Sequence, residues 1–111
     1  MNRIKLVRRA AFREDLIEHF VTIAQDQPAA AERFAQAVER LLADLTMYPE
    51  SGRRWHPMDP RLTGVRFRVV SGFNVLIFYL IRDDKLIALR ALHGARGDIQ
   101  ALLEDDVTKD G

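Results

Sequence analysis

The spacing of apolar residues first predicts two helices. Apolar side chains recur at three- and four-residue intervals in two segments, residues 10–25 and residues 28–47. The first stripe contains Phe12, Leu16, Ile17, Phe20 and Ile23, and the second contains Ala30, Ala31, Phe34, Ala37, Val38, Leu41, Leu42 and Leu45. Pro28 suits the first turn of the second helix, with Asp26 or Gln27 at its N-cap. The short break between the segments predicts an antiparallel helical hairpin.

After Gly64 the apolar period changes to two, which predicts strands. Apolar and other residues alternate over residues 65–70. Residues 73–81 are apolar on both faces except at Asn74, and residues 86–92 form a third strand. The middle segment therefore reads as a central strand that is covered on both sides. Ser71-Gly72 and residues 82–85 are predicted hairpin turns. Residues 4–7 are a further short strand, predicted from propensity alone.

These elements predict an α+β fold in the order β-α-α-β-β-β-α. An antiparallel sheet, with the N-terminal strand, carries the helical hairpin on one face. A short C-terminal helix, capped by Asp98 and containing Leu102, partly covers the other face. Full burial of the central strand then needs further cover, which suggests a partner. We expect one domain over residues 1–103 and a flexible acidic tail over residues 104–111.

Composition excludes several classes of protein. The chain has no cysteine, so disulfides and thiolate zinc sites are absent. No apolar run approaches the ~20 residues of a membrane span, and the basic N-terminus lacks the apolar core of a secretory signal. The three histidines have no metal-site spacing, and neither a P-loop nor a dinucleotide fingerprint occurs. We therefore expect no metal, no cofactor and no membrane partner.

Charge is distributed unevenly along the chain. Residues 52–98 carry nine basic and four acidic residues, whereas residues 99–111 carry one basic and four acidic. An anionic partner should therefore meet the sheet region rather than the helices. The loop at residues 48–61 brings Arg53, Arg54, Trp55 and His56 together. Either this loop is a basic contact surface, or it is a connector that holds Trp55 against the core.

Arginines inside the predicted strands are the best candidates for chemistry. They are Arg66, Arg68 and Arg90, with Arg96 shortly after the last strand. Such side chains can bind phosphates or the acidic groups of a protein partner, or they can form local pairs on a solvated face. Cleavage of RNA would also need a general acid or base, and only His93 lies near in sequence.

The order and spacing of several segments resemble the RelE/ParE toxin family of type II toxin–antitoxin systems. These segments are AAFREDLIEHF, PAAAERFAQAVERLLADL, YPESGRR, LTGVRFRVV, SGFNVLIFYLI and LIALRALHGARGDIQALL. The resemblance covers nearly the whole chain, from the first strand to Leu103. It implies a small cytoplasmic toxin that inhibits growth and is held inactive by a cognate antitoxin protein.

The family that the chain resembles has two different activities. RelE-like members cleave mRNA on the ribosome, and ParE-like members inhibit DNA gyrase. Arg66 and Arg68 match basic strand positions of the nuclease branch. Asn74 and Gln100, however, stand where that branch often has an arginine and a tyrosine. The ending HGARGDIQALL looks ParE-like, although Gly97 is inserted between the usual arginine and aspartate.

The sequence therefore favours a ParE-like toxin with DNA gyrase as its target. Its candidate partner-binding residues are Arg53, Arg54, Trp55, Arg66, Arg68, Arg90 and Arg96. The alternatives are a RelE-like ribosome-dependent mRNA endonuclease and a non-toxic relic that only binds its antitoxin. The nuclease would use Arg66, Arg68, Arg90, His93 and Arg96.

Overall fold

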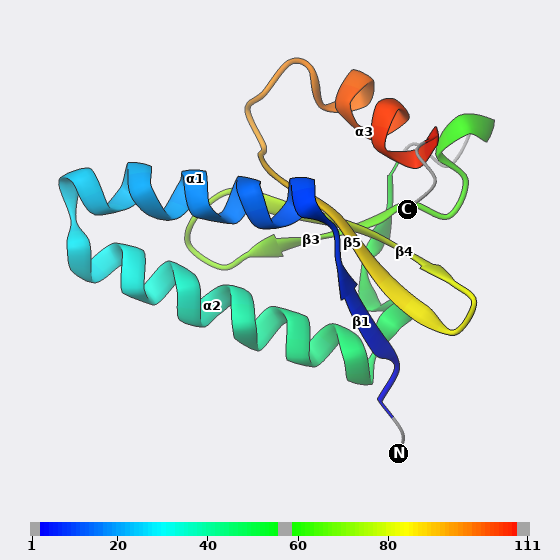
Figure 1. Cartoon of the computed structure of the whole chain (residues 1–111), viewed down its shortest axis with the longest axis horizontal. Helices are drawn as coiled ribbons and strands as arrows, with labels where there is room; N and C mark the ends of the chain where they lie inside the picture. Colours follow the sequence, from blue (N-terminus) through cyan, green and yellow to red (C-terminus); the bar gives the residue numbers. More distant parts are fainter. Residues whose placement is uncertain (1–2, 56–58, 109–111) are drawn as a thin grey trace.

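The computed structural model describes residues 3–55 and 59–108 of the chain. Its elements, in order, are β1 (Lys5–Arg8), α1 (Ala10–Asp26), α2 (Pro28–Met47), η1 (Pro49–Ser51), β2 (Arg53–Arg54), η2 (Pro60–Leu62), β3 (Arg66–Val70), β4 (Val75–Arg82), β5 (Lys85–His93) and α3 (Ile99–Thr108). The elements η1 and η2 are single 3₁₀ turns. Figure 1 shows α1 and α2 as an antiparallel pair, with α3 set apart from both.

The described strands form a five-stranded mixed sheet in the order β1-β5-β4-β3-β2. The strands β3, β4 and β5 pair antiparallel, whereas β1 pairs parallel with β5. The predicted α+β fold and its helical hairpin are confirmed. The sheet is mixed rather than purely antiparallel because β1 and β5 are not joined by a hairpin. Both helices and the strands β2 to β4 lie between them in the chain, so β1 can pair parallel with β5.

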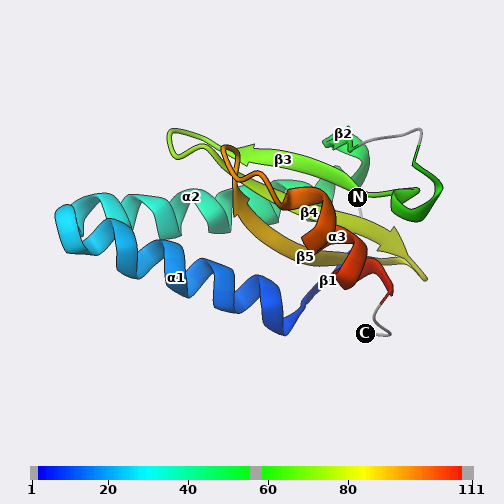
Figure 2. The same ribbon diagram turned by 90° about the horizontal axis from the view of Figure 1, so that it is seen from above.

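Each face of the sheet is buried by elements of the same chain. The helical hairpin packs Phe12, Phe34 and Leu42 against one face. On the other face, Leu62 and residues of α3 pack against Phe78 and Leu80 of the central strand. Figure 2 shows α3 crossing over β5. The chain therefore supplies the cover that the sequence analysis assigned to a partner.

The two hairpin turns differ in length. Asp83 and Asp84 form a two-residue turn between β4 and β5, and their φ angles of 54° and 60° are those of a type I′ turn. The turn between β3 and β4 has four residues, since Val70 pairs with Val75. Gly72 within it has φ 87°, which favours glycine. The two-residue turn predicted at Ser71-Gly72 is therefore wrong, and β4 begins after Asn74.

The segment predicted as a loop at residues 48–61 contains short regular pieces. Arg53 and Arg54 form β2, which pairs with Phe67 and Arg66 of β3. A two-residue strand carries too little pattern to be recognised from sequence. His56 lies outside the described residues.

The C-terminal helix is longer than expected. It runs to Thr108, five residues beyond the predicted domain limit at Leu103. Asp106 is buried and only 3% exposed. The expected flexible tail is therefore helical over its first five residues, because Asp106 bonds to the sheet and anchors the last turn.

A buried tyrosine locks η1 and β2 onto the sheet. The Tyr79 hydroxyl donates to the Pro49 carbonyl at 2.7 Å, and the Gly52 N–H donates to the same hydroxyl at 2.9 Å. Tyr79 is fully buried, and this burial raises its pKa. A Cβ atom on Gly52 would lie against the Tyr79 hydroxyl and 2.9 Å from the Phe67 carbonyl oxygen. Position 52 therefore requires glycine because of space rather than backbone angle.

We expect Gly52→Ala to lower the free energy of unfolding by about 2–3 kcal/mol, since overpacking displaces the Tyr79 hydroxyl from its two bonds. Urea unfolding followed by circular dichroism measures this loss. Gly97→Ala is the matched control, because nothing lies within 4 Å of a Cβ at position 97. Equal stability of the two variants would show that the close approach at Gly52 has no energetic weight.

Candidate functional site

Arg90 lies in a nearly buried ion-pair network that joins three elements. Its guanidinium donates to both carboxylate oxygens of Asp15 in α1, at 2.7 Å and 2.8 Å. It also donates to Asp106 in α3 at 3.2 Å. The exposed fractions of the three side chains are 15%, 12% and 4%. These hydrogen bonds raise the pKa of Arg90, Asp15 contributing most. Arg90 therefore links β5 to both α1 and α3.

Side chains of α1 complete the hydrogen bonding of β5 where β1 ends. The last β1 pairing joins Arg8 to Ala88, so the edge of β5 beyond it has no strand partner in the described chain. There the Asp15 carboxylate accepts the Ala91 N–H at 2.9 Å, and His19 Nε2 donates to the Ala91 carbonyl at 2.7 Å. The carbonyl can only accept, so the hydrogen of the His19 ring is on Nε2.

The side chain of Arg9, just after β1, reaches the main chain of α3. The Arg9 guanidinium donates to the Asp106 carbonyl at 2.7 Å. At the neighbouring position Arg8 binds Glu39 of α2 through two hydrogen bonds of 3.0 Å and 2.9 Å, which lower the pKa of the Glu39 carboxylate. Neither contact could be predicted from the sequence, because each joins residues far apart in the chain.

The structure brings Arg66 and Arg68 together on the helix-facing side of β3, as their alternation predicts. Arg66 donates to the carbonyls of Gly52 at 2.9 Å and Glu50 at 3.2 Å. Arg68 donates to Asp44 at 3.0 Å and to the Ser51 hydroxyl at 2.8 Å. Both guanidinium groups therefore hold η1 against the sheet.

The loop residues divide into a core residue and two free cations. Trp55 packs edge-on against Phe67 and Phe78, with ring centroids 5.6 Å and 5.2 Å apart. This supports the connector interpretation for Trp55. Arg53 and Arg54 are exposed and, among the described residues, have no side-chain partner.

His93 is the last residue of β5, and Arg96 follows three residues later. Both are exposed. The His93 Nδ1 accepts the Ala95 N–H at 3.1 Å. Arg96 pairs with Asp98 at 2.8 Å and lowers the pKa of that carboxylate. The strand β4 lies between β5 and β3, so these two strands are about 10 Å apart. His93 and Arg96 therefore do not converge with Arg66 on one site.

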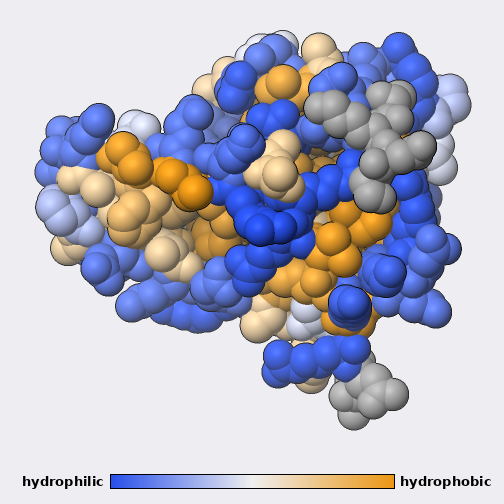
Figure 3. Space-filling model, in the orientation of Figure 1, coloured by the Kyte–Doolittle hydropathy of each residue, from blue (hydrophilic) through white to orange (hydrophobic). Residues whose placement is uncertain are grey.

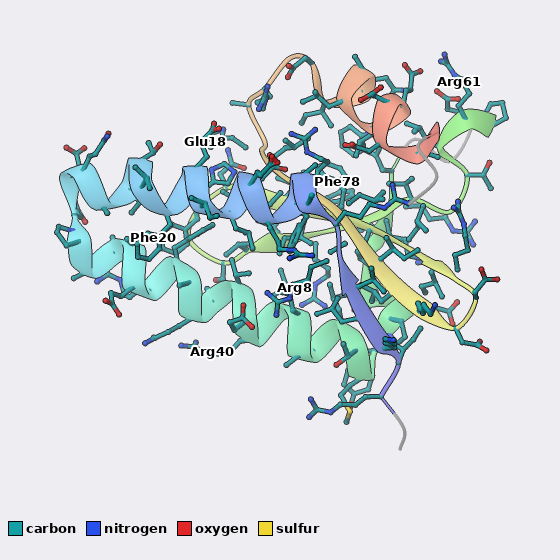
Figure 4. All side chains as sticks on the ribbon, in the orientation of Figure 1. Arg8, Glu18, Phe20, Arg40, Arg61 and Phe78 are labelled. Atoms are coloured by element: carbon teal, nitrogen blue, oxygen red, sulfur yellow. The ribbon has the colours of Figure 1, made fainter. Side chains whose placement is uncertain are left out.

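An apolar patch on the helical hairpin is the surface feature that sequence analysis missed. Ile17, Phe20 and Val21 of α1 are 64%, 37% and 50% exposed. Ile17 and Phe20 border a hollow of about 270 Å³ whose floor includes Phe34 and Val38 of α2. Figure 3 shows this patch in orange over the hairpin, and Figure 4 shows Phe20 between the two helices. The predicted stripe included Ile17 and Phe20 but assigned them to the core.

The described part of the chain contains neither a metal-binding cluster nor a membrane-spanning helix. Within residues 3–55 and 59–108, histidine, aspartate and glutamate nowhere gather in a group that could hold a metal ion. Over the same residues, every helix is too short or too polar to cross a membrane.

The fold is that of toxins from toxin–antitoxin systems. The chromosomal ParDE system from Pseudomonas aeruginosa superposes with a TM-score of 0.70 at 15% identity, covering 82% of this chain and 96% of that one. The RelBE2 toxin–antitoxin complex from Mycobacterium tuberculosis gives 0.56 at 20% identity over 86% and 97%. A copper-bound mutant toxin from Helicobacter pylori gives 0.57 at 18% identity over 81% and 93%.

The sequence itself identifies the family. Residues 6–97 match the profile of the ParE toxin of the type II toxin–antitoxin system parDE. The chain therefore belongs to the ParE toxin family, which confirms the resemblance noted from the sequence. No curated protein sequence shows a significant match to the chain.

We expect Arg90→Met to lower the free energy of unfolding by about 3–5 kcal/mol, because it leaves the Asp15 carboxylate buried without its guanidinium. Urea unfolding measures the loss. Arg96→Met is the matched control, and its exposed pair should contribute less than about 1 kcal/mol.

The milder variant Asp106→Asn keeps the experiment informative if Arg90→Met does not fold. It should cost about 1–3 kcal/mol, since Arg90 keeps Asp15 as a partner. Loss of stability no greater than that of Arg96→Met in both variants would contradict the structural role of Arg90.

Proposed function

We propose that this ParE-family toxin inhibits DNA gyrase in the cytoplasm by binding it, and that a cognate antitoxin neutralises the toxin. The proposal makes the chain a protein-binding inhibitor rather than an enzyme. Its partners are then two proteins, the antitoxin and the target.

The observation that carries this proposal is that the strand arginines already bind groups of the same chain. Arg90 is buried between Asp15 and Asp106, and Arg66 and Arg68 bind η1. A nuclease needs cations that are free to stabilise the charge of the scissile phosphate, beside a general acid or base. These arginines are committed to internal contacts, which supports inhibition by binding over cleavage of RNA.

The surface offers groups suited to protein partners. The exposed apolar patch of Ile17, Phe20 and Val21 has the character of a contact surface for another protein. Elsewhere on the molecule, Arg53 and Arg54 add two exposed guanidinium groups that have no side-chain partner among the described residues. The P. aeruginosa and M. tuberculosis structures are of a toxin–antitoxin system and a toxin–antitoxin complex, which supports an antitoxin as one of the partners.

A supercoiling assay tests the target. Purified toxin should block ATP-dependent supercoiling of relaxed plasmid by gyrase, and the antitoxin should restore supercoiling. The matched control is Arg90→Met, which should lose inhibition in proportion to its loss of folded protein.

Normal supercoiling at saturating toxin would contradict the proposal. Primer extension on translated mRNA after induction then separates the remaining alternatives. New 5′ ends would identify a ribosome-dependent endonuclease. Absence of both activities, with normal growth on expression, would identify a non-toxic relic.

A further inference from the structure

Two arginines of α2 differ from most arginines of the described chain, because they bind no group of that chain. The arginines that donate to carboxylates or carbonyls of the same chain include Arg8, Arg66, Arg68, Arg90 and Arg96. Arg33 and Arg40 are exposed and have no side-chain partner among the described residues. A guanidinium group without a partner keeps its N–H donors available to a ligand.

Arg33 and Arg40 lie on one face of α2. Seven residues make almost two turns of an α-helix, so the two side chains leave the helix in nearly the same direction, about 10 Å apart along its axis. Ala37 lies between them in the helix and contributes only a methyl group. Figure 4 shows Arg40 projecting from α2 on the side away from α1. This face of α2 therefore presents two guanidinium groups with no bulky side chain between them.

The same face of α2 borders a hollow of about 490 Å³, which we call the α2–turn hollow. Its other wall is the turn between β3 and β4, where the exposed Ser71 adds a hydroxyl group opposite the arginines. Among the described residues that line the hollow, Arg33 and Arg40 are charged and none is acidic. The α2–turn hollow therefore carries an uncompensated positive charge that attracts anions.

The lining favours phosphate groups over the side chains of a protein. Apart from the arginines it consists mostly of small or polar residues, such as Gln27, Ala30 and Gly72. The centre of a protein interface is usually apolar, and this chain has such a surface on α1 at Ile17 and Phe20. Phosphate oxygens, by contrast, match the paired N–H groups of a guanidinium and need no apolar surroundings.

A row of phosphates fits the spacing of the two arginines. The phosphates of one DNA strand follow each other at about 3.4 Å along the duplex axis, so guanidinium groups about 10 Å apart meet different phosphates of one strand. A nucleotide or a single strand would gain from an aromatic face on which its base can stack. Phe73, an aromatic residue of the hollow, already packs against Phe34 with ring centroids 5.2 Å apart. Duplex DNA needs no such face, because its bases stack on one another.

We propose that the α2–turn hollow binds the phosphate backbone of duplex DNA through Arg33 and Arg40, without regard to base sequence. Among the described residues, no histidine or glutamate lines the hollow, so this contact binds DNA and does not cleave it. Gyrase acts on duplex DNA, so a toxin bound to gyrase would meet the DNA segment that the enzyme holds. This link to gyrase rests on the proposed function.

Fluorescence anisotropy of a short labelled DNA duplex, titrated with the purified full chain, tests this proposal. The logarithm of the binding constant should fall with the logarithm of the salt concentration with a slope of about −2, since each neutralised phosphate contributes about −0.9. The double variant Arg33→Gln and Arg40→Gln should weaken binding roughly tenfold or more and bring the slope close to zero. Circular dichroism should show an unchanged fold, because both side chains are exposed.

Two controls show whether the effect belongs to the α2–turn hollow. Arg82→Gln removes an exposed charge from the far end of β4 and should leave the affinity and the slope unchanged. A second duplex of unrelated sequence should bind equally, since phosphate contacts carry no sequence information. The proposal is overturned by undiminished binding of the double variant, by an equal loss in Arg82→Gln, or by a preference for one duplex.

Competition separates the possible ligands. Polyglutamate and ATP, each at the same concentration of negative charge as an unlabelled duplex, should displace the labelled duplex less well than the unlabelled duplex does. Stronger displacement by polyglutamate would overturn the proposal in favour of an acidic protein segment, and stronger displacement by ATP in favour of a nucleotide site. Because these titrations contain no gyrase, their failure leaves the proposed gyrase inhibition standing. Failure of the supercoiling assay likewise leaves the DNA contact intact.

Discussion

The Arg90 ion-pair network is the constraint on which the other parts of this toxin depend. A single guanidinium on β5 holds Asp15 of α1 and Asp106 of α3, so the helices on both sides of the sheet share one charged centre. Asp15 also accepts the Ala91 N–H and thereby ends the sheet at the point where β1 stops. Removing one member would leave the opposite charge in a site that is nearly closed to water, so the network is more demanding than an apolar contact.

The other strand arginines are held by internal contacts as well. Arg90, Arg66 and Arg68 all bond to groups of the same chain. The exposed groups that remain for binding lie away from the centres of the strands. Among the described residues, the apolar patch on α1 and the two arginines of β2 are exposed groups that make no such internal contact. They are therefore the groups that the proposed function assigns to protein partners.

The sequence predicted the fold well because the apolar periods are local. The bounds of α1 and α2 agree with prediction to within one residue, and the central strand was recognised from its nearly unbroken apolar run. The partners of the arginines could not be predicted, because Asp15 and Arg90 are separated by 75 positions and no local pattern records their contact. The end of α3 was missed for the same reason: Glu104, Asp105 and Asp106 read as a polar tail until Arg90 is placed beside them.

The sequence separation of these contacts also bears on the order in which the chain can fold. Asp15 is made early in translation, Arg90 late and Asp106 later still. The helical hairpin can form from neighbouring residues. The Asp15 carboxylate on it, however, gains its counterion Arg90 only after most of the described chain has been synthesised. Contacts so distant in sequence slow folding, because the intervening chain must be ordered before they form. A nascent toxin of this kind therefore remains incomplete until α3 has been synthesised.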